Sequence, residues 1–232
     1  MNPEFWQSRW QEGHIGFNQS TPNPLLTRHC TDLQMPIGSR LFVPLCGKSI
    51  DMLWLAMQGY DVVGVELVET AVQAFFAEQH IEPTIYQHAD NPAIKYYQGQ
   101  LPSQSSDQAS ASTITLWVAD IFSLSPTDIG AIDAIYDKAA LIALPADMRI
   151  AYSEQMLSLC RGADGHVAPQ LLLTLNYDQT KKDGPPFSIS DEQIQHYYGN
   201  HYQISELNSL PTSIGSAPDL TVTEHVWLLS SK

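Results

Sequence analysis

Short apolar runs alternate with amphipathic segments along most of the chain. The runs are typical of buried strands in a parallel sheet, and they lie at residues 41–45, 61–67, 113–118, 132–136 and 167–175. Apolar residues three and four positions apart predict helices at residues 4–12, 23–29, 50–58, 68–79, 145–161 and 191–198. Strands alternating with helices indicate an α/β fold with a doubly wound sheet. Shorter strands are expected at residues 84–86 and 94–97, with an antiparallel pair at residues 202–207 and 222–229.

An acidic residue closes the second of the buried strands. Glu66 lies roughly 20 positions after Gly47, the glycine of the turn that follows the first strand. In doubly wound sheets, a carboxylate at this place accepts hydrogen bonds from ribose hydroxyls. The alternative is that Glu66 only starts a solvated loop or caps the next helix. The pattern favours a nucleoside site.

The turn itself carries neither of the phosphate-binding motifs that it partly resembles. A P-loop needs a glycine where this chain has Phe42. A dinucleotide-binding turn needs three glycines, and the stretch Pro44-Leu45-Cys46-Gly47 supplies one. A ligand with a ribose but no phosphate fits better, and the common one is S-adenosylmethionine.

Two tryptophans near the N-terminus share one helix face, since Trp6 and Trp10 are four positions apart; Phe17 follows in a glycine-punctuated loop. These rings either fill a gap in the flank of the sheet or belong to a lid, residues 1–30, that closes over the ligand. An aromatic ring near a sulfonium gains about 0.5–2 kcal/mol of cation–π attraction. The residues alone leave both interpretations open.

The chain is expected to form one domain over residues 1–232. Residues 98–112 are small and polar between predicted strands, which predicts a flexible surface loop rather than a linker. The stretch Asp183-Gly184-Pro185-Pro186-Phe187 passes over the ligand edge of the sheet, as a stiff pocket wall or as a simple turn.

The composition of the chain disfavours several classes of binding partner. A net charge of −14 disfavours nucleic acid and anionic membranes. No apolar run approaches the roughly 20 residues that cross a bilayer, and the first residues do not have the pattern of a signal peptide, so a cytoplasmic protein is expected. The three separated cysteines and the scattered histidines indicate neither a disulfide nor a metal site. No large apolar stripe remains unassigned, which favours a monomer.

Five stretches together carry a specific resemblance. They are the pattern of Trp6, Trp10, Gly16 and Phe17, then VPLCGKS, GVE, IYDKAALIALP, and NYDQT followed by GPPFS. In this order the chain resembles the thiopurine S-methyltransferases, particularly their bacterial branch, over nearly its whole length. The resemblance implies a Rossmann-like sheet of seven strands, mostly parallel with a C-terminal antiparallel strand, plus an N-terminal helical lid. It implies S-adenosylmethionine as cofactor and S-adenosylhomocysteine as product.

The resemblance also implies the roles of individual residues. Those expected to bind the cofactor are Trp6, Trp10, Phe17, Leu45, Glu66, Asp120, Ile121 and Lys138. Those expected to line the acceptor pocket are Phe17, Pro44, Tyr177, Pro185 and Pro186. Glu66 would hold the ribose hydroxyls, and Asp120 and Ile121 would lie beside the adenine. Lys138 is the expected catalytic residue, as a group that positions the acceptor.

Two positions depart from the family pattern. Relatives usually carry arginine where this chain has Lys138, so the positive charge is kept but the planar fork for bidentate binding is lost. Asn18 replaces the histidine expected after Phe17. No arginine follows Arg161, so the substrate preference is expected to differ from that of the animal enzymes.

The expected reaction is methyl transfer to an aromatic or heterocyclic thiol, and also to selenium or tellurium species. Aromatic thiols ionise near neutral pH and the methyl donor is already activated, so positioning and exclusion of water should matter more than acid–base chemistry. Two alternatives stay open. One is a methyltransferase for another small-molecule oxygen or nitrogen acceptor, which needs a base near the pocket; the other is a non-catalytic nucleoside-binding module.

Overall fold

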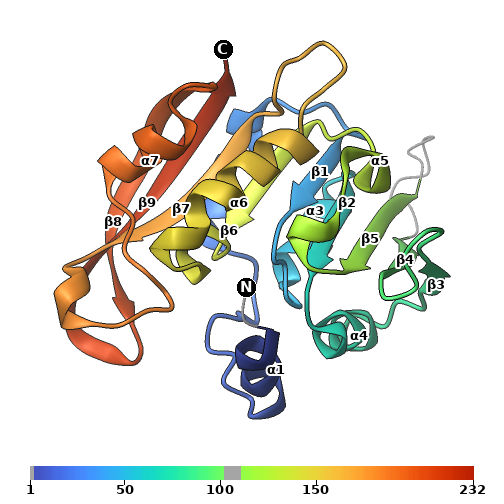
Figure 1. Ribbon diagram of the computed structural model, residues 1–232, viewed down its shortest axis with the longest axis horizontal. Coiled ribbons are helices and arrows are strands. Elements are labelled where there is room, and N and C mark those ends of the chain that lie inside the picture. The colour runs from blue at the N-terminus through green and yellow to red at the C-terminus, as the bar shows by residue number, and fades with distance from the viewer. Residues whose placement is uncertain (1–2, 102–110) are drawn as a thin grey trace.

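The structure, a computed structural model, describes residues 3–101 and 111–232 (Figure 1). Within these residues it shows one sheet of nine strands in the order β3-β4-β5-β2-β1-β6-β7-β9-β8. The strands are β1 Arg40–Val43, β2 Asp61–Glu66, β3 Thr84–Gln87, β4 Lys95–Leu101, β5 Ser112–Val118, β6 Ala134–Lys138, β7 Gln170–Asn176, β8 Tyr202–Ile214 and β9 Ala217–Ser231. The α/β class predicted from the apolar runs is therefore confirmed.

The sheet is larger than the seven strands that the resemblance implied. Strands β5, β2, β1, β6 and β7 are parallel to one another, and the antiparallel hairpin β8–β9 follows at the β7 edge. A second antiparallel hairpin, β3–β4, adds the two extra strands at the β5 edge. It pairs the backbone groups of β5 that would otherwise form an open sheet edge.

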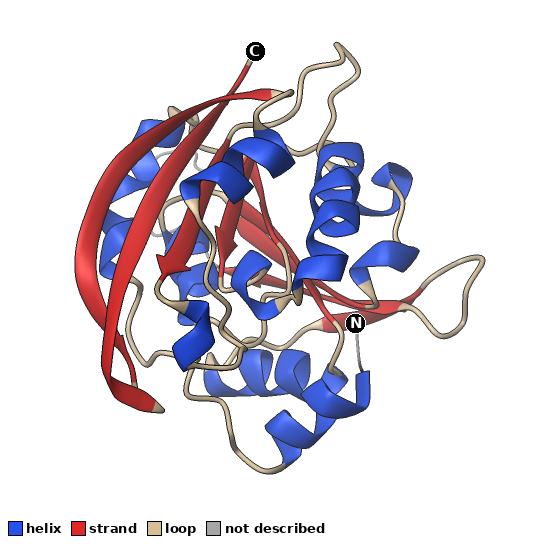
Figure 2. Ribbon diagram, turned by 60° about the vertical axis from the view of Figure 1, so that its left-hand side comes forward, coloured by secondary structure: helices blue, strands red, loops and turns tan. Residues whose placement is uncertain are grey.

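Helices cover both faces of the sheet (Figure 2). They are α1 Pro3–Gln11, α2 Pro24–His29, α3 Ile50–Met57, α4 Glu69–Glu78, α5 Pro126–Ile129, α6 Ala146–Leu159 and α7 Asp191–Tyr198. Alternate residues of β1 serve the two faces: Phe42 packs in the core with α6 and α7, whereas Leu41 and Val43 pack in the core with α2, α3 and α4. None of the helices in the described part of the chain combines the length and apolar character needed to cross a membrane.

Local capping explains where several helices begin. The side chain of Asn23 caps α2, that of Ser49 caps α3, and that of Ser190 caps α7, where Gln193 completes a capping box. Ser49 and Ser190 directly precede the helices predicted at residues 50–58 and 191–198. Because Ser49 caps α3 directly after the turn at Gly47, the first turn of this helix lies next to the carboxyl end of β1.

Three predicted boundaries need correction. Strand β4 continues to Leu101 and β5 begins at Ser112, so the predicted loop loses its first four residues and its last one to strands. Most of that loop, residues 102–110, lies outside the described residues. Strand β6 continues to Lys138, two residues beyond the predicted end, so Asp137 is a buried strand residue. Strands β8 and β9 are longer than the strands predicted at residues 202–207 and 222–229. They continue past the end of β7 to the turn that joins them (Figure 1).

Close packing at the centre of the sheet makes one stability prediction. A Cβ atom at Gly64 of β2 would lie 2.6 Å from Cδ2 of Leu116 and 2.8 Å from Sγ of Cys46. Gly64→Ala should therefore lower the free energy of unfolding by about 1–3 kcal/mol, as overpacking does in well-packed cores. Urea unfolding measures the change. Gly215→Ala is the matched control, since no atom lies within 4 Å of the added methyl group; equal stability of the two variants would contradict the prediction.

Candidate active site

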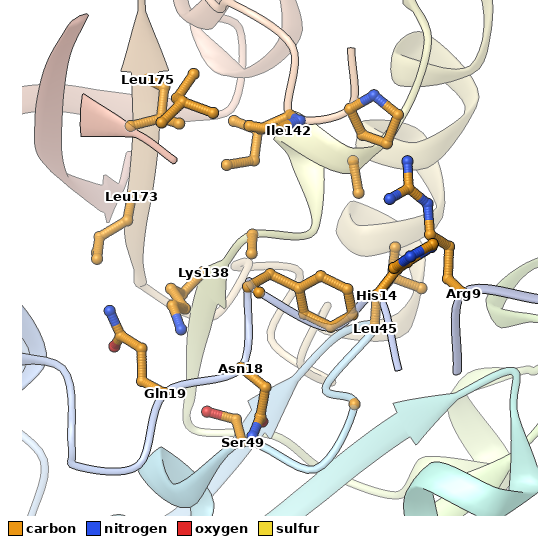
Figure 3. Close-up of a pocket in the computed structure, with 18 of the residues that line it drawn as sticks. Arg9, His14, Asn18, Gln19, Leu45, Ser49, Lys138, Ile142, Leu173 and Leu175 are labelled. Carbon is orange, nitrogen blue, oxygen red and sulfur yellow. The ribbon is translucent and has the colours of Figure 1, made fainter. Parts of the chain in front are cut away.

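A cavity of about 720 Å³ opens at the carboxyl ends of the parallel strands. This volume lies in the range of roughly 300–1,000 Å³ that small-molecule sites occupy. Its wall includes Trp6, Arg9, Trp10, His14, Phe17, Asn18, Gln19, Leu45, Gly47, Ser49, Glu66, Lys138, Ile142, Leu173, Leu175, Pro185, Pro186, residues 212–216 and Glu224. Figure 3 shows Arg9 and His14 of the N-terminal segment across the cavity from Leu173 and Leu175 of β7.

Glu66 lies at one end of this cavity and is held by backbone amides. Its side chain accepts hydrogen bonds from the N–H of Gly47, at 2.9 Å, and from the N–H of Val68, at 2.8 Å. Burial raises the pKa of Glu66, and these N–H groups oppose that rise. Each bonded oxygen keeps a second acceptor site, so the carboxylate can still bind a ribose diol. Glu66 is therefore no solvated loop residue.

The turns after β1 and β6 have strained backbones. Leu45 has a φ of 45° and Ala139 a φ of 67°, in the left-handed region that residues with a side chain rarely adopt. Such positions cost about 1–3 kcal/mol each and concentrate at ligand sites. Strands β1 and β6 are neighbours in the sheet, so the two turns lie side by side in the cavity wall.

The N-terminal aromatic rings gather over the first turn. The ring centroid of Phe17 lies 6.1 Å from that of Trp6 and 5.8 Å from that of Trp10, in edge-to-face geometry. A Cβ at Gly47 would lie 3.2 Å from the Trp10 ring, so this ring packs directly on the turn. No residue of α1 is fully buried. The rings line the cavity instead of filling the flank of the sheet, and their contact with a cofactor stays a prediction.

Lys138 projects into the middle of the cavity from the end of β6 (Figure 3). Its ammonium lies 3.9 Å from a carboxylate oxygen of Asp51, which is buried and also accepts hydrogen bonds from Tyr136 Oη and the N–H of Asn23. Asp51 belongs to α3, so this carboxylate links the helix to strand β6 and to the chain before α2. The ion pair directs the lysine side chain, which is 15% exposed.

Asp137, next to Lys138, faces the other side of the sheet. It has no exposed surface, and it accepts hydrogen bonds from Tyr152 Oη at 2.8 Å and from the N–H of Leu141 at 3.3 Å. Burial raises the pKa of Asp137 to about 6, although these donors favour its charged form. The carboxylate thereby anchors the strained segment at Ala139 to helix α6.

The double-proline loop is braced on three sides. Tyr177 Oη donates to the carbonyl of Pro186 at 2.6 Å, and the N–H of Phe187 donates to the carbonyl of Ile142 at 2.7 Å. The guanidinium of Arg149 lies over the Phe187 ring, 5.3 Å from its centroid. Pro185 and Pro186 line the cavity, and their contact with an acceptor stays a prediction.

Four of the predicted site residues are absent from the cavity wall in the described part of the chain. Pro44 is buried, and Tyr177 supports the proline loop from behind. Asp120 caps the short helical turn that begins at Ile121, and Ile121 is buried. Both residues follow Ala119, the first residue after β5, which donates its N–H to the carbonyl of Glu66. The structure thus places them beside the Glu66 end of the cavity, and an adenine contact remains a prediction.

Other wall residues were missed by sequence reasoning. Arg9, His14, Gln19, residues 212–216 and Glu224 line the cavity although none belongs to a recognised motif. Arg9 lies between Trp6 and Trp10 in α1. Glu224 lies in a terminal strand where polar and apolar residues alternate, so nothing in the pattern separates it from a solvent-facing residue.

The wall suits a nucleoside with a cationic centre better than a metal ion. It combines a carboxylate acceptor at Glu66 with the aromatic rings of Trp6, Trp10 and Phe17. In the part of the chain that the structure describes, His, Cys, Asp and Glu form no group of three that could hold a metal. Cys46 lines the cavity, but burial raises the pKa of its thiol well above the ordinary value, so it is no ready nucleophile.

Comparison with known proteins identifies the family. A family model described as thiopurine S-methyltransferase matches residues 1–229. The thiopurine S-methyltransferase of Psychrobacter cryohalolentis is 60% identical over 230 residues, which cover 99% of each chain. That of Teredinibacter turnerae is 42% identical over 230 residues, 99% of this chain and 98% of the relative.

Solved structures of low sequence identity share the fold. A SAM-dependent methyltransferase from Anabaena variabilis has a TM-score of 0.61 at 13% identity, covering 99% of this chain and 95% of that one. The 1,6-didemethyltoxoflavin-N1-methyltransferase of Burkholderia thailandensis, solved with S-adenosylhomocysteine, has a TM-score of 0.59 at 13% identity, covering 99% and 87%. These similarities show the fold alone.

The buried position of Asp137 predicts a pH dependence of stability. Its folded pKa of about 6 exceeds the ordinary value of 3.8, so between these values the folded state binds more protons than the unfolded state. The stability of the wild type relative to Asp137→Asn should fall by up to about 3 kcal/mol as the pH rises through this window and stay constant above it. Urea unfolding at several pH values measures this difference; a difference independent of pH would contradict the prediction. Asp219→Asn, an exposed control, should not change the slope.

Proposed function

The chain belongs to the thiopurine S-methyltransferase family and takes its methyl group from S-adenosylmethionine, and from this premise we propose that the acceptor is the sulfur of an aromatic or heterocyclic thiol. The observation that carries the proposal is one continuous cavity. It has the Glu66 carboxylate at one end, the Lys138 ammonium in its middle and aromatic rings above. A nucleoside and a small planar acceptor can therefore occupy it together.

The cofactor end is formed by the first two turns of the sheet. When bound, S-adenosylmethionine supplies a methyl group on a sulfonium that needs no further activation. Glu66 would hold the ribose hydroxyls, Leu45 would contact the cofactor from β1, and Asp120 and Ile121 would flank the adenine. Trp6, Trp10 and Phe17 would cover it and exclude water, which strengthens electrostatic contacts inside the cavity.

The acceptor end is formed by β6, β7 and the proline loop. Phe17, Pro185 and Pro186 offer apolar surface to a planar ring, with Pro44 and Tyr177 supporting the wall from behind. The ammonium of Lys138 favours the thiolate form of the acceptor by charge. The side chain would act by orienting the sulfur, because a well-oriented reaction gains effective molarities of about 10⁵ M or more.

Acceptors containing selenium or tellurium are a second proposal on the same chemistry, because their anions are soft nucleophiles of similar kind. An oxygen or nitrogen acceptor is the alternative, since a solved structure with this fold belongs to an N1-methyltransferase. Membership of a methyltransferase family decides against a non-catalytic nucleoside-binding module. The cytoplasmic location and the monomeric state expected from the sequence stay predictions.

The role of Glu66 is testable by binding alone. Glu66→Gln should weaken the binding of S-adenosylhomocysteine by tenfold or more, about 1.4 kcal/mol, because an amide keeps one acceptor oxygen where the carboxylate has two. Isothermal titration calorimetry measures the affinity. Glu82→Gln, exposed beyond α4, is the matched control and should bind as the wild type does. A wild type without affinity for S-adenosylhomocysteine would overturn the cofactor assignment.

The role of Lys138 separates turnover from cofactor binding. With an aromatic thiol and S-adenosylmethionine, Lys138→Met should lower kcat by tenfold or more, because the ammonium no longer orients the thiolate. Its affinity for S-adenosylhomocysteine should fall by a clearly smaller factor than kcat does. Methylated product is quantified by chromatography, and Lys95→Met, whose ammonium pairs with Glu69 outside the cavity, serves as control. Equal losses of turnover and affinity, or no loss, would contradict this role; a wild type inactive on every thiol would sink the proposed function.

A further inference from the structure

Glu224 faces the acceptor end of the cavity from a strand beyond Lys138. Lys138 is paired with Leu173 across β6 and β7, and Glu224 is paired with Leu175 across β7 and β9. Paired residues point to the same face of a sheet, as do residues two apart on one strand. Lys138 and Glu224 therefore share a face, and both side chains line the cavity.

Glu224 differs from the other carboxylates at this edge because its oxygens are uncommitted. Those of Glu66 accept from backbone N–H groups, and those of Asp51 accept from Asn23 and Tyr136. Asp137 lies on the opposite face and is bound to Tyr152. Within the part of the chain that the structure describes, Glu224 makes no hydrogen bond or ion pair. The Glu66 carboxylate thus keeps only its second acceptor sites for a ligand, whereas the Glu224 carboxylate offers all of its acceptor sites.

The surroundings of Glu224 suit a proton acceptor. Partial burial raises its pKa, and the ammonium of Lys138 opposes the rise. Two further polar groups face this region: the charge of Glu224 raises the pKa of Tyr136 on β6, and Asp51 on α3 pairs with Lys138. Arg9 and His14 face the same cavity from the N-terminal segment. A carboxylate in such a setting takes up a proton more readily than one in water.

We propose that Glu224 is a catalytic residue, the general base for acceptor thiols that are neutral when they bind. This inference rests on the proposed function and deepens it. An aromatic thiol that arrives as the thiolate needs no base, whereas an alkyl or weakly acidic thiol carries its proton into the cavity. Glu224 thereby extends the acceptor range from ionised aromatic thiols to neutral ones.

The step balances in charge and atoms. The thiol sulfur forms a bond to the methyl carbon, and the bond from that carbon to the donor sulfur breaks with its electron pair left on the donor sulfur. The thiol proton moves to a carboxylate oxygen of Glu224. The positive charge of the donor and the negative charge of the carboxylate are both lost, and the proton leaves to solvent after the products depart.

The experiment compares two acceptors on the same enzyme preparations. 4-Nitrobenzenethiol is ionised at neutral pH, whereas benzyl mercaptan, like a cysteine thiol with a pKa of about 8.5, is mostly neutral. Glu224→Gln should lower kcat/KM for benzyl mercaptan by about 10²-fold or more, the range of general base catalysis, and change it less than twofold for 4-nitrobenzenethiol. Asp219→Asn, an exposed residue of the same strand, is the control and should affect neither acceptor.

Two further readouts separate a base from a structural residue. In a pH profile with benzyl mercaptan, kcat/KM of the variant should rise only as the thiol ionises. That of the wild type should rise already at lower pH, as Glu224 loses its proton. Calorimetric affinity for S-adenosylhomocysteine should be unchanged, which reports an intact cofactor site. If the Glu224→Gln variant binds no S-adenosylhomocysteine, the Glu224→Asp variant is used instead, because aspartate keeps the negative charge but is shorter by one methylene group. A loss of activity confined to benzyl mercaptan is again expected.

Equal losses on both acceptors, or none on either, would overturn the role of Glu224 while the proposed function stands. A wild type that binds S-adenosylhomocysteine but methylates neither thiol would instead refute the proposed function, and the role of Glu224 with it. The two failures are therefore distinguishable.

Discussion

Glu66 accepts hydrogen bonds from the N–H groups of Gly47 and Val68, so one buried carboxylate joins the turns that follow β1 and β2. Burial of a charge is costly unless donors compensate it, and here the backbone of two turns provides them. The same contact holds Gly47 where Trp10 packs on it, which brings the N-terminal segment over the sheet edge. The position of the first turn, of the N-terminal aromatic rings and of the proposed ribose acceptor thus depends on a single side chain.

From this point the cavity follows the sheet towards its other edge. Charged groups are spaced along it, with Glu66 at the end of β2, Lys138 at the end of β6 and Glu224 on β9. A carboxylate at the first position suits a diol and a cationic donor, and an ammonium at the second suits an anionic acceptor. The carboxylate at the third suits an acceptor that must lose a proton. Charge therefore changes sign twice along the cavity, so one wall serves both a donor and an acceptor.

The supports behind the wall are buried polar contacts that hold strained turns. Asp137 and Tyr152 anchor the segment at Ala139 from one face of the sheet, and Asp51 with Tyr136 directs Lys138 from the other. Neighbouring residues of one strand thus point to opposite faces yet act on the same turn. Such opposed anchoring keeps a non-glycine residue at positive φ, because relaxation of the turn would break bonds on both faces.

The strands, most helices, their caps and the ligand edge follow from the sequence alone, because apolar runs and periodicity report burial within a few residues of each position. Glu66 could be proposed as a site residue because the proposal depends on its distance along the chain from Gly47. Tertiary structure decided that the sheet has nine strands and that Asp137 is buried. It also decided that Arg9, His14 and Glu224 line the cavity. Each depends on which strands become neighbours and on which face a side chain points. The electrostatic interaction between residues as distant in the sequence as Lys138 and Glu224 leaves no local pattern. The sequence by itself determined the elements and the family motifs, whereas the charge that meets the acceptor was determined only when β9 paired with β7.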